Sequence, residues 1–89
     1  MISSEDRAKI VKIAKMYRVK RVLLFGSNAS PNVEGRDIDL AVEGVQPKDF
    51  YRFCGDLMFS LSKPVDVVDL KARSKFVRMI DAEGVQLYG

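Results

Sequence analysis

Apolar residues recur at helical spacing near the start of the chain. Ser3 followed three residues later by Asp6 is typical of a helix start, with Glu5 and Asp6 complementing the helix dipole. The apolar positions that follow have the i, i+3, i+4, i+7 spacing of one buried helix face. They are Ile10, Ile13, Ala14 and Tyr17. We therefore predict a helix that begins near Ser3 and ends near Tyr17 or Arg18.

Three later apolar runs have the length and pattern of strands. Residues 22–25 are continuously apolar, residues 37–42 alternate, and residues 65–70 follow Pro64. A short edge strand is expected over residues 85–88. The segment between the first two runs is rich in Gly, Ser, Asn and Pro, and it predicts a loop with at most one helical turn.

Two further helices are predicted between and after these strands. The first covers residues 47–62, since Pro47 suits a first helical turn. Its apolar face should be formed by Phe50, Phe53, Cys54, Leu57, Met58 and Leu61. The last helix carries Phe76, Val77 and Ile80 and ends at Gly84. The order of elements predicts an α/β (α+β) fold in which helices flank a small mixed sheet.

Length and composition are those of one small globular domain. The chain has 89 residues, of which 47% are hydrophobic and 30% charged. A domain of this size buries only about 60–65% of its unfolded surface, so an enzyme built on it would need another chain to complete its pocket wall. No apolar run approaches the ~20 residues that span a bilayer, and the charged N-terminus does not fit a secretory signal. We expect a single domain, residues 1–89, in the cytoplasm and without a membrane partner.

The reactive residue types limit the possible chemistry. Histidine is absent and Cys54 is the one cysteine. An internal disulfide, a Cys/His zinc site and a histidine general base are therefore excluded. Cys54 lies in the predicted apolar stripe, which favours packing over nucleophilic chemistry. Acid–base and metal chemistry falls to carboxylates, which prefer hard cations such as Mg²⁺ or Mn²⁺.

Basic residues are concentrated near the N-terminus. Seven of the 15 lysines and arginines lie in the first 21 positions: Arg7, Lys9, Lys12, Lys15, Arg18, Lys20 and Arg21. Such a cluster can attract anions, but a solvated helix face is the more common explanation. The net charge of +3 is modest, and we do not expect direct nucleic-acid binding.

Two carboxylates are spaced to share one face of a strand. Asp37 and Asp39 are two residues apart, so their side chains should point the same way with Cα atoms about 7 Å apart. Carboxylates at that spacing can converge on cations placed between them, whereas Ile38 and Leu40 should point to the core. A lone Asp-x-Asp is also common among solvated strand residues.

A Gly-Ser pair follows the first predicted strand directly. Gly26 lets a ligand approach the backbone without a Cβ in the way. If a helical turn starts at Ser27, its free N–H groups and the Ser27 hydroxyl can bind phosphate. The loop is not a Walker A motif, because no Gly-Lys-Ser/Thr follows. Alone, a Gly-Ser pair more often marks an ordinary turn.

The third predicted strand carries two more carboxylates, Asp66 and Asp69. Their odd spacing places them on opposite faces, so only one can join the Asp37/Asp39 pair. Asp66 lies among valines, where a carboxylate needs a partner such as a cation. We predict that Asp66 faces the site and that Asp69 caps the strand end.

Taken together, these segments resemble the minimal nucleotidyltransferases of the DNA polymerase β superfamily. The resemblance extends from about residue 20 to the C-terminus and rests on four segments: LLFGS at 23–27, DIDLAV at 37–42, PVDVV at 64–68 and GVQLYG at 84–89. It implies a polymerase β-like palm fold, a nucleoside triphosphate substrate and two Mg²⁺ ions. By the same resemblance, Gly26 and Ser27 bind the triphosphate, and Asp37, Asp39 and Asp66 bind the metals.

Two positions depart from the family pattern. The Arg-Gly that commonly follows the Gly-Ser is replaced within Asn28–Pro31, and Arg36 stands where a serine usually precedes the Asp-x-Asp. Arg36 is therefore a candidate phosphate contact or simply an exposed residue. The metal-binding positions are intact.

The resemblance also implies a partner and an acceptor. Family members are often antitoxins paired with helical HEPN-domain toxins, and some transfer AMP from ATP to a toxin tyrosine. The expected function is therefore Mg²⁺-dependent protein adenylylation within a hetero-oligomer, with a homodimer also possible. Alternatives are a nucleotide-binding module that neutralises its partner by contact, transfer to RNA or a small molecule, and an inactive α/β domain.

Overall fold

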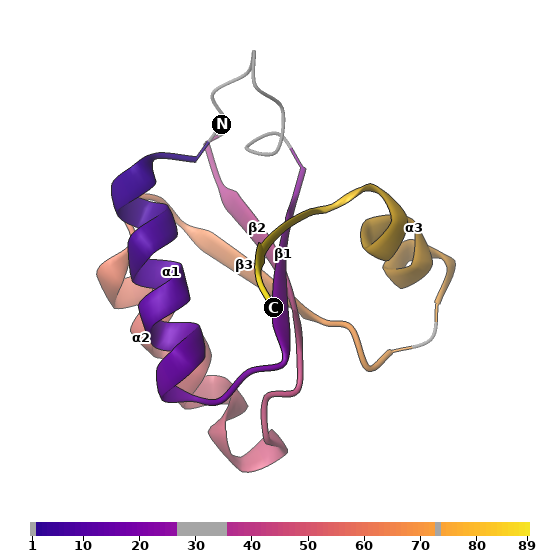
Figure 1. Ribbon diagram of the computed structural model, residues 1–89, viewed down its shortest axis with the longest axis horizontal. Coiled ribbons are helices and arrows are strands. Elements are labelled where there is room, and N and C mark those ends of the chain that lie inside the picture. The colour runs from indigo at the N-terminus through magenta and orange to yellow at the C-terminus, as the bar shows by residue number, and fades with distance from the viewer. Residues whose placement is uncertain (1, 27–35, 73) are drawn as a thin grey trace.

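The structure is a computed structural model that describes residues 2–26, 36–72 and 74–89. A sheet lies between two helical layers (Figure 1). Two helices, α1 (Ser4–Met16) and α2 (Phe50–Ser60), lie on one side of it. The third, α3 (Lys75–Glu83), lies on the other side. None of the described helices is long and apolar enough to cross a membrane.

Over the described residues, the sheet has four strands in the order β3-β2-β1-β4. They are β1 (Arg21–Phe25), β2 (Ile38–Glu43), β3 (Val65–Asp69) and β4 (Val85–Tyr88). The first strand is antiparallel to both of its neighbours, whereas β2 and β3 are parallel. A parallel pair needs a crossover connection, and α2 supplies it. The predicted mixed sheet flanked by helices is therefore confirmed.

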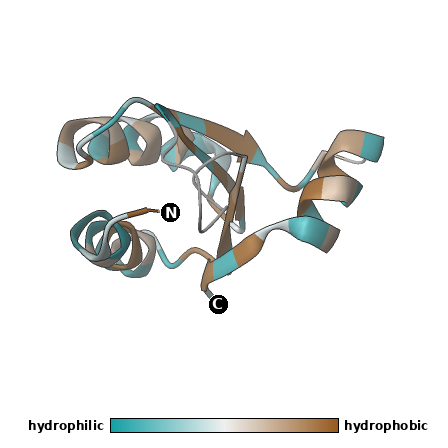
Figure 2. Ribbon diagram, turned by 90° about the horizontal axis from the view of Figure 1, so that it is seen from above, coloured by the Kyte–Doolittle hydropathy of each residue, from teal (hydrophilic) through white to brown (hydrophobic). Residues whose placement is uncertain are grey.

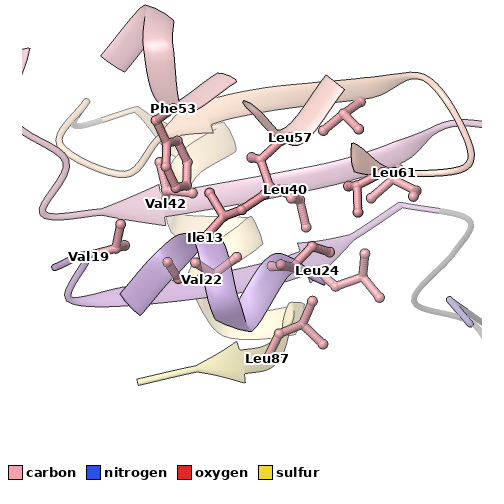
Figure 3. Close-up of a cluster of buried hydrophobic side chains, with 14 residues drawn as sticks. Ile13, Val19, Val22, Leu24, Leu40, Val42, Phe53, Leu57, Leu61 and Leu87 are labelled. Atoms are coloured by element: carbon pink, nitrogen blue, oxygen red, sulfur yellow. The ribbon is translucent and has the colours of Figure 1, made fainter. Parts of the chain in front are cut away.

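The main hydrophobic core fills the space between the α1/α2 layer and the sheet. Figure 3 shows Ile13 of α1 and Phe53 and Leu57 of α2 meeting the side chains of the central strands. Successive strand residues point to opposite faces, so every second residue of β1 and β2 reaches this core. Those residues are Val22, Leu24, Ile38, Leu40 and Val42, each fully buried.

The opposite sheet face has a smaller core beneath α3. It is formed by Leu23, Ala41 and Ile80. Figure 2 shows α3 on the opposite side of the sheet from the other two helices. Gly84 allows this helix to approach the sheet closely. A Cβ at Gly84 would lie 2.7 Å from the Ile80 carbonyl oxygen and 3.3 Å from the Leu23 Cβ. Asp81 of α3 also accepts two hydrogen bonds from the Arg21 guanidinium of β1.

Two helices, α1 and α3, begin directly after a serine that caps them. The Ser3 hydroxyl oxygen accepts a hydrogen bond from the Asp6 N–H at 3.1 Å, which confirms the predicted start of α1. Ser74 caps α3 in the same way, with the Val77 N–H as donor. These bonds satisfy backbone donors that a helix start otherwise leaves unpaired.

Several predicted boundaries differ by a few residues. The predicted strand 37–42 is observed as Ile38–Glu43, because its pairing with β3 begins at Ile38 and its pairing with β1 extends to Glu43. The predicted helix 47–62 is divided into a 3₁₀ turn, Pro47–Asp49, and α2. The predicted strand 65–70 ends at Asp69.

The prediction that Met58 faces the core was wrong. Met58 is 63% exposed, while its neighbour Leu57 is fully buried. The buried positions of α2 and its cap are Phe53, Leu57 and Leu61, which are four residues apart and form a narrow stripe. Met58 lies about 100° around the helix from Leu57 because an α-helix has 3.6 residues per turn.

Candidate functional site

Three candidate residues form a row at one end of the sheet: Gly26, Asp39 and Asp66. The Cα atoms of Phe25 and Asp39 are paired across β1 and β2, and those of Asp39 and Asp66 across β2 and β3. Neighbouring strands are about 4.8 Å apart, and paired residues point to the same face. Asp39 and Asp66 are therefore direct neighbours on the α3 side of the sheet.

Gly26 lies against this pair from the end of β1. Its φ is +77°, a left-handed conformation that side chains disfavour. A Cβ built on Gly26 would overlap the Asp39 carboxylate oxygen Oδ2. Both features require a glycine here, so the end of β1 brings exposed backbone next to the carboxylate. The predicted approach of a ligand to this backbone stays a prediction.

Asp39 lies near two other negatively charged side chains, Asp66 and Asp37, which repel its charge. Partial burial raises the pKa of the Asp39 carboxyl, and the neighbouring charges of Asp66 and then Asp37 raise it further. Burial and like charges both disfavour the ionised form. A cation placed among these carboxylates would lower the pKa of Asp39 and stabilise the ionised carboxylates. Their arrangement therefore favours binding of a cation.

The donor set fits magnesium held jointly with a substrate. Carboxylate oxygens are the ligands that Mg²⁺ and Mn²⁺ prefer. Within the part of the chain that the structure describes, no three acidic or cysteine side chains converge as a ready-made metal site. Protein-bound Mg²⁺ is commonly held by one or two carboxylates together with substrate phosphates and water. The paired Asp39 and Asp66 can provide those carboxylates.

The remaining predicted site residues lie just before β2 or among the residues that the structure does not describe. Asp37 is exposed one residue before β2, close enough for its charge to affect Asp39. Arg36 precedes it and is also exposed. Ser27 lies outside the described residues, as does the divergent loop segment Asn28–Pro31. The metal-binding role of Asp37 and the phosphate-binding roles of Ser27 and Arg36 stay predictions.

Asp69 caps the end of its strand as predicted, and Cys54 is a half-buried residue of α2. The Asp69 carboxylate accepts a hydrogen bond from the Lys71 N–H at 2.9 Å, which caps the end of β3. Asp69 pairs with Val42 on the face opposite Asp66. Partial burial raises the pKa of the Cys54 thiol, so little of it is the reactive thiolate at neutral pH.

Sequence reasoning did not single out the aromatic residues beside this row. Phe25 and Phe76 contact each other edge to face, with ring centroids 6.0 Å apart. They line a cleft of about 470 Å³ together with Gly26 and three residues of α3, which are Met79, Ile80 and Glu83. The sequence did not reveal that Phe25 shares a face with Asp39, because a continuously apolar strand does not show which face each residue occupies. The strand register places them on the same face.

The fold and this row of residues agree with a family match. Residues 8–89 match the model of the polymerase β nucleotidyltransferase family. The chain therefore belongs to that family, and the sequence resemblance is confirmed. No curated protein sequence matches the chain.

Solved structures of toxin–antitoxin pairs have the same fold. A chain of the MntA–HepT toxin–antitoxin crystal structure superposes with a TM-score of 0.73 at 25% identity, covering 98% of this chain and 73% of that one. A toxin–antitoxin structure with AMP-PNP gives 0.75 at 27% identity, covering 93% and 73%. A complex of tri-AMPylated Shewanella oneidensis HEPN toxin with MNT antitoxin gives 0.71 at 27%, covering 94% and 70%.

Proposed function

We propose that this nucleotidyltransferase domain transfers AMP from ATP to a tyrosine hydroxyl of a HEPN-domain partner, and so acts as an antitoxin. The observation that carries the proposal is the row formed by Gly26, Asp39 and Asp66 at one end of the sheet. Backbone that can approach phosphate lies there beside two paired carboxylates. The family match and the AMPylated HEPN toxin in a similar complex support the reaction and the acceptor.

Each residue of the row has a distinct task in this reaction. The Gly26 backbone, with Ser27, orients the β- and γ-phosphates. Asp39 and Asp66 are the carboxylates that would hold Mg²⁺ beside the α-phosphate, and Asp66 lies on the acceptor side. The acceptor hydroxyl oxygen forms a new bond to the α-phosphorus. The bond from that phosphorus to the bridging oxygen of the β-phosphate breaks, and pyrophosphate leaves. The hydroxyl proton passes to the Asp66 carboxylate or to water.

Mg²⁺, or Mn²⁺ in its place, would be held by Asp39 and Asp66 with Asp37. Two such ions, when bound, neutralise charge on the attacking and leaving oxygens. The protein residues contribute position and charge: they hold the phosphates, aim the acceptor and provide a site for its proton. ATP is the proposed nucleotide because a similar toxin–antitoxin structure contains AMP-PNP.

The test uses α-labelled ATP, Mg²⁺ and the proposed HEPN-domain partner. Labelled AMP should appear on a partner tyrosine with the wild-type chain. Asp66→Asn should abolish the label, whereas Asp69→Asn, three residues along the same strand but on its opposite face, should retain it. Equal labelling by both variants, or none with the wild-type chain, would refute the proposal.

A second candidate function is neutralisation of the partner by contact alone. Tyr51 is 88% exposed and Phe59 is 97% exposed, both on α2. Both side chains are accessible to a partner that docks on α2. The labelling experiment separates the two functions, because contact alone would inactivate the partner with no AMP attached and with Asp39→Asn as effective as the wild type.

A further inference from the structure

An apolar cleft adjoins the phosphate-binding end of β1. It is lined by Phe25 and Gly26 from the strand and by one stripe of α3. The stripe consists of Phe76, Met79, Ile80 and Glu83, which have the i, i+3, i+4, i+7 spacing of a single helix face. The cleft volume, about 470 Å³, is within the range of small-molecule sites.

Two large side chains of this cleft are half-exposed. Phe76 is 50% exposed and Met79 is 49% exposed, although both lie on the α3 face that carries the buried Ile80. The Phe76 ring contacts Phe25 at 83° between ring planes, so the two rings stand nearly perpendicular. Half-exposed aromatic and thioether groups beside a polar site are suited to cover a flat, partly apolar ligand.

We propose that this cleft binds the base of the nucleoside triphosphate, with Phe76 as the stacking residue and Met79 as a second wall. The inference rests on the proposed function, because it takes the α-phosphate, which carries the sugar and base, to lie beside Asp39. Phe25 of the cleft is the cross-strand partner of Asp39. A base joined through its sugar to a phosphate beside Asp39 is therefore close enough to enter the cleft.

The acceptor tyrosine is the less suitable occupant. The acceptor must lie near Asp66 of β3, and β3 is separated from β1 by β2. Two strand spacings place β1 roughly 10 Å from β3. The cleft lies between the end of β1 and α3. It is therefore at the β1 end of the row, away from the acceptor side.

The test compares two ligands that differ in the nucleoside. Dissociation constants for ATP and for inorganic tripolyphosphate, both with Mg²⁺, are measured by calorimetry on the full chain. Truncation of a stacked aromatic costs about tenfold or more in affinity for a base. Phe76→Ala should therefore weaken ATP binding at least tenfold and change tripolyphosphate binding less than twofold.

A matched pair of methionines provides the control. Met79→Ala should weaken ATP binding selectively, whereas Met58→Ala, an exposed residue of α2 across the sheet, should leave both ligands unchanged. Phe76→Trp adds a direct signal, because the chain has no other tryptophan. ATP should quench its fluorescence and tripolyphosphate should not.

The outcomes separate this inference from the proposed function. If the wild-type chain binds neither ligand, the proposed function fails. If it binds both but Phe76→Ala binds ATP as tightly as the wild type, the base site is refuted and the phosphate site stands. An equal loss of both ligands in Phe76→Ala, or no selective quenching in Phe76→Trp, also refutes the base site.

Discussion

The Gly26 backbone lies so close to the Asp39 carboxylate that a single added methyl group would overlap Oδ2. Gly26 directly follows β1 and Asp39 lies in β2, 13 positions further along the sequence. Their contact joins the proposed phosphate-binding backbone to the proposed metal-binding carboxylate. A change at either residue should therefore affect both functions.

Gly26→Ala should impair the site and the fold together. The left-handed conformation at Gly26 costs a non-glycine residue about 1–2 kcal/mol, and the new Cβ must also displace Asp39. We expect the free energy of unfolding in urea to fall by at least that amount and AMP transfer to fall sharply. Unchanged transfer in a folded Gly26→Ala variant would contradict the geometry of the row.

Gly55→Ala is the matched control for the glycine substitution. Gly55 lies within α2, and a Cβ there would meet nothing within 4 Å. Alanine is favoured over glycine in helices by roughly 0.5–1 kcal/mol. The variant should be slightly more stable than the wild type and should transfer AMP at the wild-type rate.

Asp39→Asn should separate activity from stability. Transfer should fall about 10²-fold or more, the scale at which loss of one preorganised electrostatic group is felt. The raised pKa of Asp39 means that its ionised form is disfavoured in the folded state, so the charge lowers stability above the folded pKa. Without Mg²⁺ at pH 7, the variant should therefore melt at a higher temperature than the wild type.

The stability difference between Asp39→Asn and the wild type should depend on pH. It should shrink as the pH falls through the raised folded pKa toward the ordinary value of 3.8, and below that value the wild-type carboxyl is protonated in both states. Melting curves over this range test the sign. A wild-type chain that is more stable than the variant at pH 7 would show that the charges around Asp39 are compensated.

Asp6 should show the opposite pH dependence. Its side chain is only 3% exposed, and the Ser62 N–H and hydroxyl both donate to its carboxylate. Burial raises the Asp6 pKa, but the hydrogen bonds from Ser62 and Ser3 outweigh burial and lower it overall. The carboxylate therefore contributes stability above pH 3.8, and this contribution is lost as the pH falls through the lowered folded pKa.

Ser62→Ala tests the Asp6 prediction. Removing the hydroxyl donor from a buried carboxylate should cost about 1–3 kcal/mol at neutral pH. Urea unfolding at pH 7 and at about pH 3 measures the difference from the wild type, which should be smaller at the lower pH. Ser4→Ala, an exposed change one position after the α1 cap, serves as the reference. An equal cost at both pH values would contradict the role of the Asp6 charge.

Adjacent residues of α2 should respond differently to truncation. Leu57→Ala removes a fully buried side chain and should cost about 2–5 kcal/mol in the free energy of unfolding. Met58→Ala removes a side chain that is 63% exposed and should change it by less than about 0.5 kcal/mol. Similar costs for the two would place Met58 in the core after all.

The local pattern was sufficient for most of the fold. Ser3 and Asp6 predicted the start of α1, and the alternation around Asp39 predicted β2, because capping and strand alternation are properties of a few neighbouring residues. The choice of Asp66 over Asp69 for the site was predictable for the same reason, because the two lie on opposite faces of one strand. The pairing of Asp66 with Asp39 depends on strand register and was not. The Met58 prediction failed because apolar periodicity defines a wide stripe, whereas packing against the sheet selects a narrow one.

The sequence by itself determined which residue types could do chemistry here: carboxylates and a glycine turn, with histidine absent. Only the tertiary structure decided how they meet. Three features join residues that are distant in the chain: the contact of Gly26 with Asp39, the cleft between Phe25 and Phe76, and the hydrogen bond from Ser62 to Asp6. Such contacts depend on strand order, register and helix placement, which arise from packing of the whole chain and not from any local pattern.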